Sequence, residues 1–480
     1  MKVARIMAST TARIGGLAAV SAALLLAGCG NTYRPVISSI NPVGPAGQPT
    51  KYAAAVSSPS PTAPGLLTMV DFSGDTILST PQILTNPNYF SVTGGGTEGF
   101  VINAAGSFND FQLGNPSSLL TANIVQTSLP ANSNPVSITA VNLGLAGYTV
   151  FIPSQGNSTV AALTINGPSL EQQIAVGANP VYVAGIDGAL RIYAISQGNG
   201  TGTCAANGQV ASLEAATPIS ISATLCVGAT PVYGVMTGDG RRAFILNNGS
   251  GTLSVINVVN NAFDSTTPLI TLPNISYKNA GGTTVSVAPK PVWADLTTVT
   301  NEMVVLNQGD GTGPGSLSIV SIPLCSSSTQ IANPNCNAAN PADAAGFGSI
   351  VANVPVGINP TMVSMLHDGT QAYVVNQKDS TGQCNAGEGS VTVVNLVTTQ
   401  VQATICGIST AAGTSSANAS PFLVYGHPNT VAVTTGSPTG KVYVTSPDSV
   451  YMTVIYTDTD SVVTHINLQG FGVRVLVTSQ

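Results

Sequence analysis

The segment "RAFILNNGSGTLSVINV", residues 242–258, decides the fold class of this 480-residue chain. It contains two apolar runs that are separated by a short turn of Asn, Gly and Ser. Short apolar runs bounded by Gly, Pro and Asn are typical of β-strands. Runs of this kind recur along the chain, and no segment shows a sustained helical period. The sequence therefore predicts an all-β protein.

Four types of strand repeat in a fixed order. Strands of the first type lie at 51–56, 99–103, 148–153, 190–196, 242–248, 303–308, 372–377 and 441–446. A second strand, often led by Gly, lies at 65–72, 251–258, 315–322 and 389–396. A third ends near Gly at 170–177, 221–228, 349–357 and 401–407, and a fourth follows Xaa-Pro at 179–185, 230–236, 290–296 and 359–366. Four strands per unit, repeated at about 40 to 70 residues, predict a β-propeller of four-stranded blades.

The sequence contains eight such units, with seven blades as the alternative. The number stays open because residues 420–440 offer two candidate strands for one position. The chain enters the domain at a strand of the first type and ends with "GVRVLVTSQ", 472–480, which suits the fourth type. The C-terminal strand is therefore predicted to complete the first blade and close the ring, which leaves no exposed sheet edge.

Three strings carry a resemblance to a known family: "YVVN" (373–376), "SVTVVNL" (390–396) and "KVYVTS" (441–446). They resemble the YVTN β-propeller repeat family of bacterial surface and secreted proteins, and the resemblance covers most of residues 51–480. It brings in neighbouring propeller families as well, such as lactonase-type hydrolases and quinoprotein-type dehydrogenases. Those enzymes use His, Glu and Arg side chains that converge at the mouth of the channel.

Residues 1–28 have the architecture of a lipoprotein signal peptide: basic residues, then the apolar run "IGGLAAVSAALLLAG", then Cys29. The segment 26–29 resembles the bacterial lipobox, in which the cysteine is lipidated, although an ordinary signal peptide with a chance cysteine is the alternative. Gly30, rather than an acidic residue, follows the cysteine, which in that family pattern implies the outer membrane. Residues 29–50 are predicted to be a Pro/Gly-rich tether, and residues 51–480 the propeller. The lipid is then the only membrane anchor, on an unspecified side of the outer membrane.

Composition narrows the class of partner. Removal of residues 1–28 takes Lys2, Arg5 and Arg13 with it, and leaves 10 of the 13 basic and all 19 acidic side chains. An acidic surface repels phosphate backbones, so nucleic acid is excluded as a partner. Charged residues are only 7% of the chain, which disfavours electrostatic steering. The protein is expected to be a monomer.

Six cysteines follow Cys29, and an even number in an exported protein suggests disulfides. Cys204 and Cys226, like Cys384 and Cys406, are 22 residues apart and occupy the same two places in their units. The first precedes a second-type strand and the other ends a third-type strand, so antiparallel pairing brings them together. We predict these two disulfides, each stabilising by roughly 3 kcal/mol, and a third by elimination. That third disulfide joins Cys325 and Cys336. Zinc is the disfavoured alternative, because no His accompanies the cysteines.

Candidate catalytic side chains are few. The sequence contains no His-Glu-x-x-His or Gly-x-Ser-x-Gly motif, and no metal or cofactor is predicted. The histidines and carboxylates that we considered are better explained by packing, solvation and turns, with acid–base or calcium roles as the alternative for the paired carboxylates and for Asp310. These residues are His367, His427 and His465, the Asp-Gly residues Asp187, Asp239 and Asp368, and Asp71, Asp75, Asp310, Asp458 and Asp460. Trp293, the only tryptophan, heads a channel-lining strand, where core packing is favoured over a pocket role.

Two kinds of loop are expected to emerge on one face of the ring: the loops that join the first strand of a unit to the second, and those that join the third strand to the fourth. This face holds the insertions 57–64, 197–207, 273–289, 308–314, 378–388 and 407–419, together with the four cysteines of the matched pairs. Loops on a rigid scaffold often carry recognition. The favoured function is therefore a non-enzymatic binding or scaffold module for a protein or glycan partner on this loop face. The alternative is an enzyme of lactonase-like or quinoprotein-dehydrogenase-like type with its site at the channel mouth, and fold resemblance alone does not decide between them.

Overall fold

The computed structural model describes residues 51–478 apart from short gaps. The gaps are 115–118, 120–123, 145–146, 166–168, 199–203, 215, 217, 298–300, 324–345, 410–421 and 435–439. The predicted signal peptide, Cys29 and the tether lie outside the described residues, and so do Cys325 and Cys336. All regular elements in the described part are strands. Over the same residues, no helix occurs with the length and hydropathy needed to cross a membrane.

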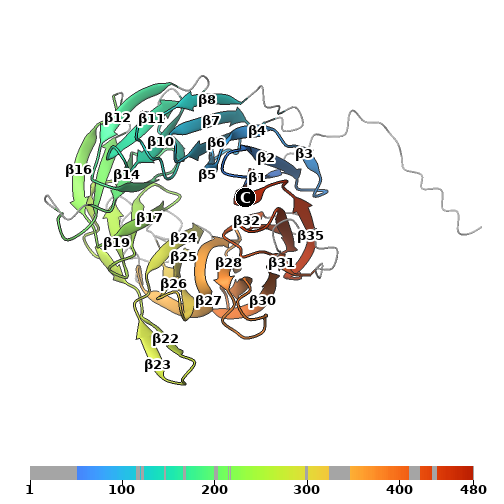
Figure 1. The fold of residues 1–480 in the computed structure, drawn as a ribbon. Coiled ribbons are helices and arrows are strands. Elements are labelled where there is room, and N and C mark those ends of the chain that lie inside the picture. Colours follow the sequence, from blue (N-terminus) through green and yellow to red (C-terminus); the bar gives the residue numbers. More distant parts are fainter. Residues whose placement is uncertain are drawn as a thin grey trace, which may run out of the picture. The chain divides into compact units, whose positions relative to one another are not determined.

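The strands form antiparallel sheets arranged radially around a central channel (Figure 1). The inner strands line the channel and contact one another around it. They are β5 (Pro87–Val92), β9 (Thr139–Asn142), β13 (Pro180–Ala184), β17 (Pro231–Met236), β24 (Pro291–Thr297), the second part of β27 (Ile350–Met365), β32 (Thr430–Thr434) and β36 (Phe471–Val477). They include the predicted fourth-type strands 179–185, 230–236, 290–296 and 359–366 and the C-terminal strand, so the predicted β-propeller is confirmed.

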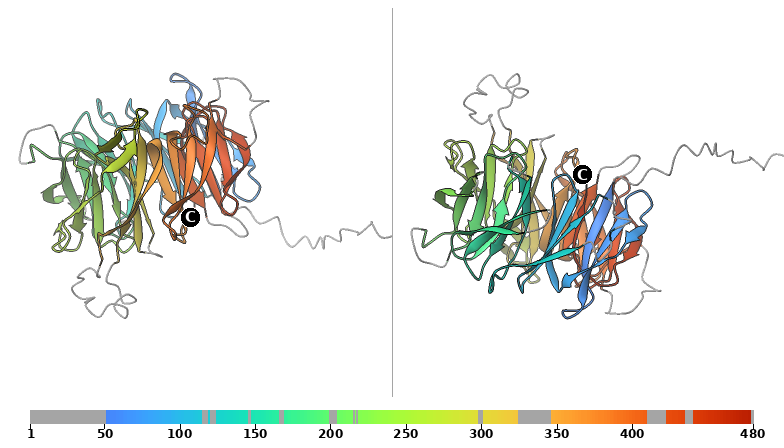
Figure 2. Two further views of the ribbon diagram at one scale, coloured as in Figure 1. Left: turned by 90° about the horizontal axis from the view of Figure 1, so that it is seen from below. Right: turned by 90° about the horizontal axis from the view of Figure 1, so that it is seen from above.

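Each sheet continues outward through three more strands. The second strands are β1 (Tyr52–Ser58), β6 (Glu98–Asn103), β10 (Tyr148–Ser154), β14 (Arg191–Ser196), β18 (Arg242–Asn247), β25 (Glu302–Asn307), β28 (Gln371–Lys378) and β33 (Lys441–Thr445). The third strands are β2 (Pro64–Asp71), β7 (Ser107–Gln112), β11 (Thr159–Thr164), β15 (Gln209–Glu214), β19 (Thr252–Asn257), β26 (Pro314–Ser321), β29 (Ser390–Asn395) and β34 (Tyr451–Tyr456). The outer strands are β3 (Ile77–Ser79), β4 (Gln82–Thr85), β8 (Val125–Ser128), β12 (Leu170–Ala175), β16 (Ile221–Cys226), β20 (Ala262–Phe263), β21 (Leu269–Thr271), β30 (Gln400–Ile408) and β35 (Ser461–Asn467). Figure 2 shows these strands running between the two faces that carry the loops.

One strand joins two sheets. β27 (Ile350–Met365) pairs with β26 through its first part and with β28 through its second part, and so creates a single eight-stranded sheet. Taken undivided, the described strands form seven sheets of four or more strands. Division at the middle of β27 turns its sheet into two four-stranded sets. The choice between seven and eight blades therefore stays a prediction.

The C-terminal strand closes the ring as predicted. β36 pairs antiparallel with β1, with Ala53 opposite Val477 and Ser58 opposite Phe471. The two ends are also joined by a hydrogen bond from the Tyr52 amide to the Thr478 hydroxyl, at 3.0 Å. The first sheet is therefore built from both ends of the described chain.

The asparagine of the "YVVN" pattern is buried and has a structural role in several blades. Asn247 and Asn307 end their second strands, Asn376 lies two residues before the end of β28, and all three are fully buried. Each side-chain amide donates to two Ser or Thr hydroxyls near the start of the third strand, at 2.9 to 3.2 Å. The Ser/Thr-x-Ser/Thr sequences after the turns supply these acceptors. The Nδ2 groups of the three asparagines thus find acceptors inside the blade, whereas their buried Oδ1 atoms have no hydrogen-bond partner among the described residues.

The tyrosines of the repeated "YVVN" and "KVYVTS" sequences join neighbouring sheets. The Tyr373 hydroxyl donates to Asp460 at 2.7 Å, and the Tyr443 hydroxyl to Asp75 at 3.4 Å. In both cases the acceptor lies in the turn after the third strand of the next sheet. Asp75 also pairs with Lys441 at 2.7 Å. These carboxylates therefore hold neighbouring sheets together, which supports the structural interpretation over an acid–base or calcium role.

Candidate functional site

Four aromatic side chains occupy the same position on four inner strands. Each lies two residues after a proline, and the strand register shifts between the proline and the aromatic residue. They are Tyr89, Tyr182, Tyr233 and Trp293. A β-bulge re-aims the side chain that follows it. The repeated Pro-x-aromatic sequence thus places four rings at one level of the channel.

Arg474 occupies the equivalent position on β36. It lies opposite Val56 of the neighbouring strand, as Tyr233 lies opposite Leu246. Gly472 stands two residues before it, where the other strands have proline. We call Arg474 and the four aromatic residues the channel ring.

The channel ring is a continuous stack. The ring centroids of Tyr182 and Tyr233 are 4.5 Å apart, and those of Tyr233 and Trp293 are 4.1 Å apart at an interplanar angle of 19°. The Arg474 guanidinium lies 4.1 Å from the Tyr89 ring centroid and 5.3 Å from that of Trp293. These are cation–π distances. The guanidinium is thus held between two aromatic faces.

Arg474 has no anionic partner among the described residues. Its guanidinium makes no ion pair there, and its buried Nε has no hydrogen-bond acceptor. By contrast, Arg191, Arg242 and Lys441 each contact a carboxylate at 2.7 to 2.8 Å. A half-buried cation without a partner is costly to maintain. Arg474 is therefore available to an anion that enters the channel.

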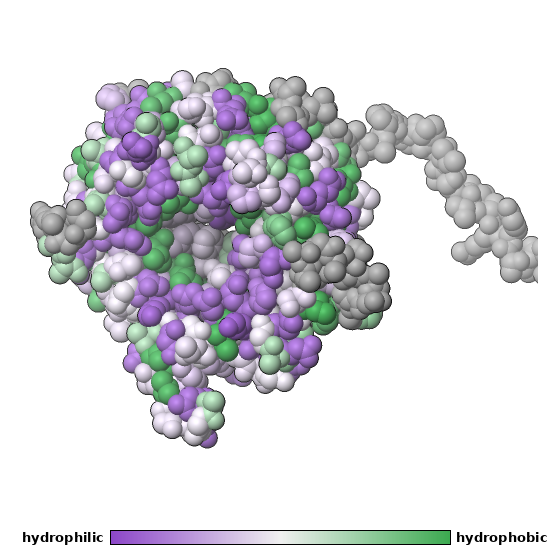
Figure 3. Space-filling view, viewed as in Figure 1, coloured by the Kyte–Doolittle hydropathy of each residue, from purple (hydrophilic) through white to green (hydrophobic). Residues whose placement is uncertain are grey.

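A cavity of about 410 Å³ extends along the channel from the ring. Figure 3 shows that the surface is hollowed at the centre of the ring. Tyr233, Trp293 and Arg474 line it together with Asp295 and Thr478. Small-molecule sites in proteins commonly have about this volume.

Asp295 is the carboxyl group in this cavity. Its two oxygens accept the backbone amides of Leu296 at 2.9 Å and Met365 at 2.8 Å. Burial nevertheless dominates, and it raises the pKa of Asp295 above its usual value. One wall of the cavity thus carries a weakened carboxylic acid, and the channel ring carries a cation.

Tyr182 and Tyr233 of the ring are neutral at physiological pH. Burial raises the pKa of Tyr182 to about 12, and burial together with Tyr182 raises the pKa of Tyr233 well above its usual value. Neutral phenols can donate hydrogen bonds to a bound group.

A second cavity, of about 450 Å³, continues the channel beside Tyr182 and Asp187. Asp187 accepts the Tyr148 hydroxyl at 2.7 Å and the Asn142 amide at 2.9 Å. Its carboxylate is thus already engaged. The first cavity, with Arg474, is the better candidate site.

The predicted disulfides are confirmed where the structure describes them. Cys204–Cys226 and Cys384–Cys406 are bonded, with Cα–Cα distances of 5.3 and 5.2 Å. The pairing of Cys325 with Cys336 lies outside the described residues and stays a prediction.

The Asp-Gly sequences form turns, as predicted. In the dipeptides 187–188, 239–240 and 368–369, the glycine has a positive φ of 66° to 74°, a conformation that glycine adopts without steric cost. Asp239 and Asp368 accept backbone amides two residues further on. Asp310 likewise accepts the backbone amides of Gly313 and Thr312. These hydrogen bonds, that of Gly313 first, are the main reason why the pKa of Asp310 is lowered. These carboxylates stabilise loops.

The histidines lie apart from the channel ring. His465 stacks on Tyr425 at 3.7 Å, and its Nε2 contacts the Leu423 carbonyl. His427 bonds Asp448 at 2.6 Å and the Gly387 carbonyl at 3.1 Å. Burial opposes its charge, but these partners outweigh it and raise its pKa. The resulting stabilisation is complete below the unfolded-state pKa and is lost as the pH rises through the raised value.

Among the described residues, no cluster of three or more His, Cys, Asp or Glu could hold a metal ion.

Comparison with known proteins supports the fold. No family model matches the chain, and no curated protein matches its sequence. Among solved structures, the chain is similar to the dihydro-heme d1 dehydrogenase NirN in complex with DHE, with a TM-score of 0.57 and 11% identity over 89% of this chain and 75% of that one. It is also similar to apo AztD from Citrobacter koseri (TM-score 0.51, 12% identity, 89% and 97% covered). A candidate 6-phosphogluconolactonase from Bacteroides fragilis gives a TM-score of 0.50 at 10% identity, with 90% and 99% covered. At such identities the similarity establishes the β-propeller fold and no activity.

Proposed function

We propose that the protein is a binding module that takes a small organic anion in its central channel. The observation that carries this proposal is Arg474, a half-buried cation without a carboxylate partner among the described residues. Its two aromatic contacts orient the guanidinium and leave its N–H groups to a ligand. Guanidinium groups bind carboxylates and phosphates through paired, charge-assisted hydrogen bonds.

The rest of the cavity defines the class of ligand further. The stacked rings of Tyr233 and Trp293 offer aromatic contact to a planar group. The volume of about 410 Å³ suits a metabolite-sized molecule rather than a polymer. An aromatic or unsaturated carboxylate fits these features best.

The single tryptophan gives a direct test. Because Trp293 belongs to the channel ring, ligand binding is expected to change the intrinsic fluorescence of the full-length protein. Benzoate-type carboxylates should bind, and the matched amides should bind about tenfold or more weakly. The variant Arg474→Met should weaken carboxylate binding by about 10- to 100-fold, since a charge-assisted pair is lost.

Arg241→Gln is the matched control, because Arg241 lies in a turn whose pair with Asp239 is exposed. It should bind as the unaltered protein does. Equal binding of carboxylates and amides, or unchanged binding by Arg474→Met, would contradict an anion site at the channel ring.

The proposal includes a location. A lipidated Cys29 would hold a monomeric propeller at the bacterial outer membrane, with residues 29–50 as its tether. The lipobox-like segment 26–29 and the acidic mature chain support this arrangement, in which the only contact with the membrane is the lipid and nucleic acid is not a partner.

Asp295 favours one second candidate function, the hydrolysis of an anionic lactone in the same cavity. Arg474 would hold the anionic group while water attacks the lactone carbonyl. The Asp295 carboxyl group, whose pKa is raised, would give its proton to the ring oxygen as the C–O bond breaks and would regain a proton from the attacking water. Assay of a panel of acidic sugar lactones tests this function. Turnover that falls by about 100-fold or more in Asp295→Asn would support an enzyme. Binding without turnover would support a non-enzymatic binding module instead.

A further inference from the structure

A further cavity lies between two of the inserted segments, away from the channel ring. A groove of about 700 Å³ separates the hairpin β22 (Ile275–Lys278) and β23 (Thr284–Val287) from the loop that follows β28. Figure 1 shows this hairpin projecting from the ring. The groove shares no lining residue with the channel cavity. The sequence marked both walls, 273–289 and 378–388, as insertions.

The hairpin wall presents a fixed aromatic ring. The Tyr277 hydroxyl contacts Asp310 at 2.8 Å and the Thr312 hydroxyl at 3.1 Å. A Cβ atom at Gly313 would lie 2.2 to 2.5 Å from atoms of this ring, so only glycine permits the contact. Tyr277 is thus held at its tip and packed against bare backbone, and it lines the groove.

The loop wall is fixed as well. The Cys384–Cys406 disulfide ties it to β30. Asp379 accepts the backbone amides of Thr381 at 3.1 Å and Gly382 at 2.9 Å, and the His427 ring contacts the Gly387 carbonyl. Both walls are therefore largely pre-formed, which lowers the entropic cost of binding.

The groove gathers unpaired positive charge in an acidic protein. Lys278 and Lys378 line it and are exposed, and within the described part of the chain neither forms an ion pair. Asp379 is the one carboxylate of the lining, and it is engaged by backbone amides. Asn279, Asn385 and Thr312 supply side-chain amides and a hydroxyl beside the lysines.

We propose that this groove binds an acidic oligosaccharide. An aromatic ring can stack on the apolar face of a sugar, amides and hydroxyls can exchange hydrogen bonds with sugar hydroxyls, and two lysines can pair with carboxylate substituents. Ile358 is the one large aliphatic side chain of the lining, which disfavours a peptide that would need several apolar anchoring pockets. The inference narrows the loop-face partner to one class and does not depend on the channel ring.

Calorimetric titration of the full-length protein with oligogalacturonates of two to six sugars tests it. We expect binding of the acidic oligomers and at least tenfold weaker binding of neutral maltooligosaccharides of equal length. Lys278→Gln and Lys378→Gln should each weaken binding about tenfold, and the double variant more. Lys290→Gln, which removes an exposed lysine outside the groove, should bind as the unaltered protein does.

Two results would overturn the proposal: lysine variants that bind oligogalacturonate with unchanged affinity, or polyglutamate that binds as tightly as the acidic sugars. The second would assign the groove to acidic peptides. The Arg474→Met variant separates the two sites, because it should keep its affinity for oligogalacturonate. Loss of that affinity in Arg474→Met would overturn the independence of the groove.

Discussion

A chain that ends before Phe471 is expected to lose cooperative folding. The deletion removes β36, which is the inner strand of the first sheet and lines the channel. It exposes the inner edge of β1, whose residues Ala53, Ala54 and Ala55 are fully buried in the intact protein. It also removes the contact of the Val475 amide with the Thr430 hydroxyl, at 3.2 Å, between neighbouring inner strands. The ring thus opens at its closure.

The expected loss in the free energy of unfolding is about 5 kcal/mol or more, which is comparable to the whole stability of many domains. Chemical denaturation followed by circular dichroism measures it. A broad or absent transition is the expected result, whereas a melting curve that matches the intact protein would show that closure contributes little.

A circular permutant provides the control. The Thr478 amide donates to the Tyr52 carbonyl at 3.0 Å, so the two ends already lie side by side. A short linker from residue 478 to residue 51, with new termini near Gln469, keeps every strand and moves the break to the other side of β36. This permutant should retain nearly native stability, which would assign the truncation effect to the missing strand rather than to altered termini.

The repeat explains how much of this architecture the sequence predicts. Each blade repeats Asn, Gly and hydroxyl residues at fixed places, because a buried amide such as Asn376 needs its partners in every copy. The pairing of Cys204 with Cys226 followed from the same regularity. Ring closure was visible because the two ends of the domain carry complementary strand types.

The channel ring was harder to predict, because its members lie far apart in sequence. Trp293 was considered alone, and core packing was favoured; it does pack against two core clusters, and it also lines a cavity beside Arg474. The recurrence of an aromatic residue two positions after proline was the signal that could have found the tyrosines. Arg474 gives no such signal, since Gly472 replaces the proline and only the strand register reveals the equivalence.

The hairpin of β22 and β23 was also not predicted. Its strands, Ile-Ser-Tyr-Lys and Thr-Val-Ser-Val, do alternate apolar and polar residues, but each is only four residues long, which is too short for the alternation to stand out within an insertion. The packing of Tyr277 on Gly313 holds it in place, and this contact joins two insertions that no local pattern connects.

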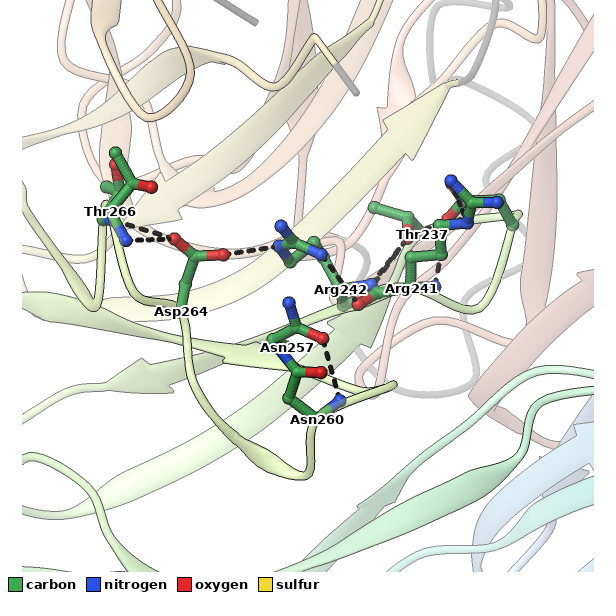
Figure 4. Close-up of polar contacts among 9 residues, drawn as sticks. Thr237, Arg241, Arg242, Asn257, Asn260, Asp264 and Thr266 are labelled. Atoms are coloured by element: carbon green, nitrogen blue, oxygen red, sulfur yellow. Dashed lines mark hydrogen bonds and ion pairs between the residues drawn. The ribbon is translucent and has the colours of Figure 1, made fainter. Parts of the chain in front are cut away.

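Removal of one partner of the buried ion pair between Arg242 and Asp264 is expected to cost about 3 to 5 kcal/mol. The Arg242 Nε lies 2.8 Å from Asp264 Oδ2, and each side chain is only 2% exposed. Figure 4 shows Asp264 between this guanidinium and the backbone amide of Thr266, which donates at 2.9 Å. In Asp264→Asn the amide oxygen can still accept from the backbone, so the variant removes only the charge and the acceptor that face Arg242.

Arg241→Gln is the matched control, because its partner Asp239 lies 4.0 Å away and both side chains are 36% exposed. Exposed pairs contribute about 0 to 1 kcal/mol. The double variant Arg242→Met/Asp264→Asn should recover part of the loss of Asp264→Asn, because it leaves no unpaired buried charge. If Asp264→Asn and Arg241→Gln cost the same in urea denaturation, the buried pair makes no special contribution.

The same variants predict a dependence on pH. Burial opposes the negative charge of Asp264, but the amides of Thr267 and Thr266 together with Arg242 outweigh it and lower its pKa from the usual 3.8. The stabilisation is therefore present above the unfolded-state pKa and is lost as the pH falls through the lowered value in the folded protein. The difference in the free energy of unfolding between the unaltered protein and Asp264→Asn should be constant from neutral pH down to about pH 4 and should shrink below it. A difference that instead grows on acidification would mean that the carboxyl group is protonated in the native protein, and the ion pair would then not be what holds Arg242 in the blade.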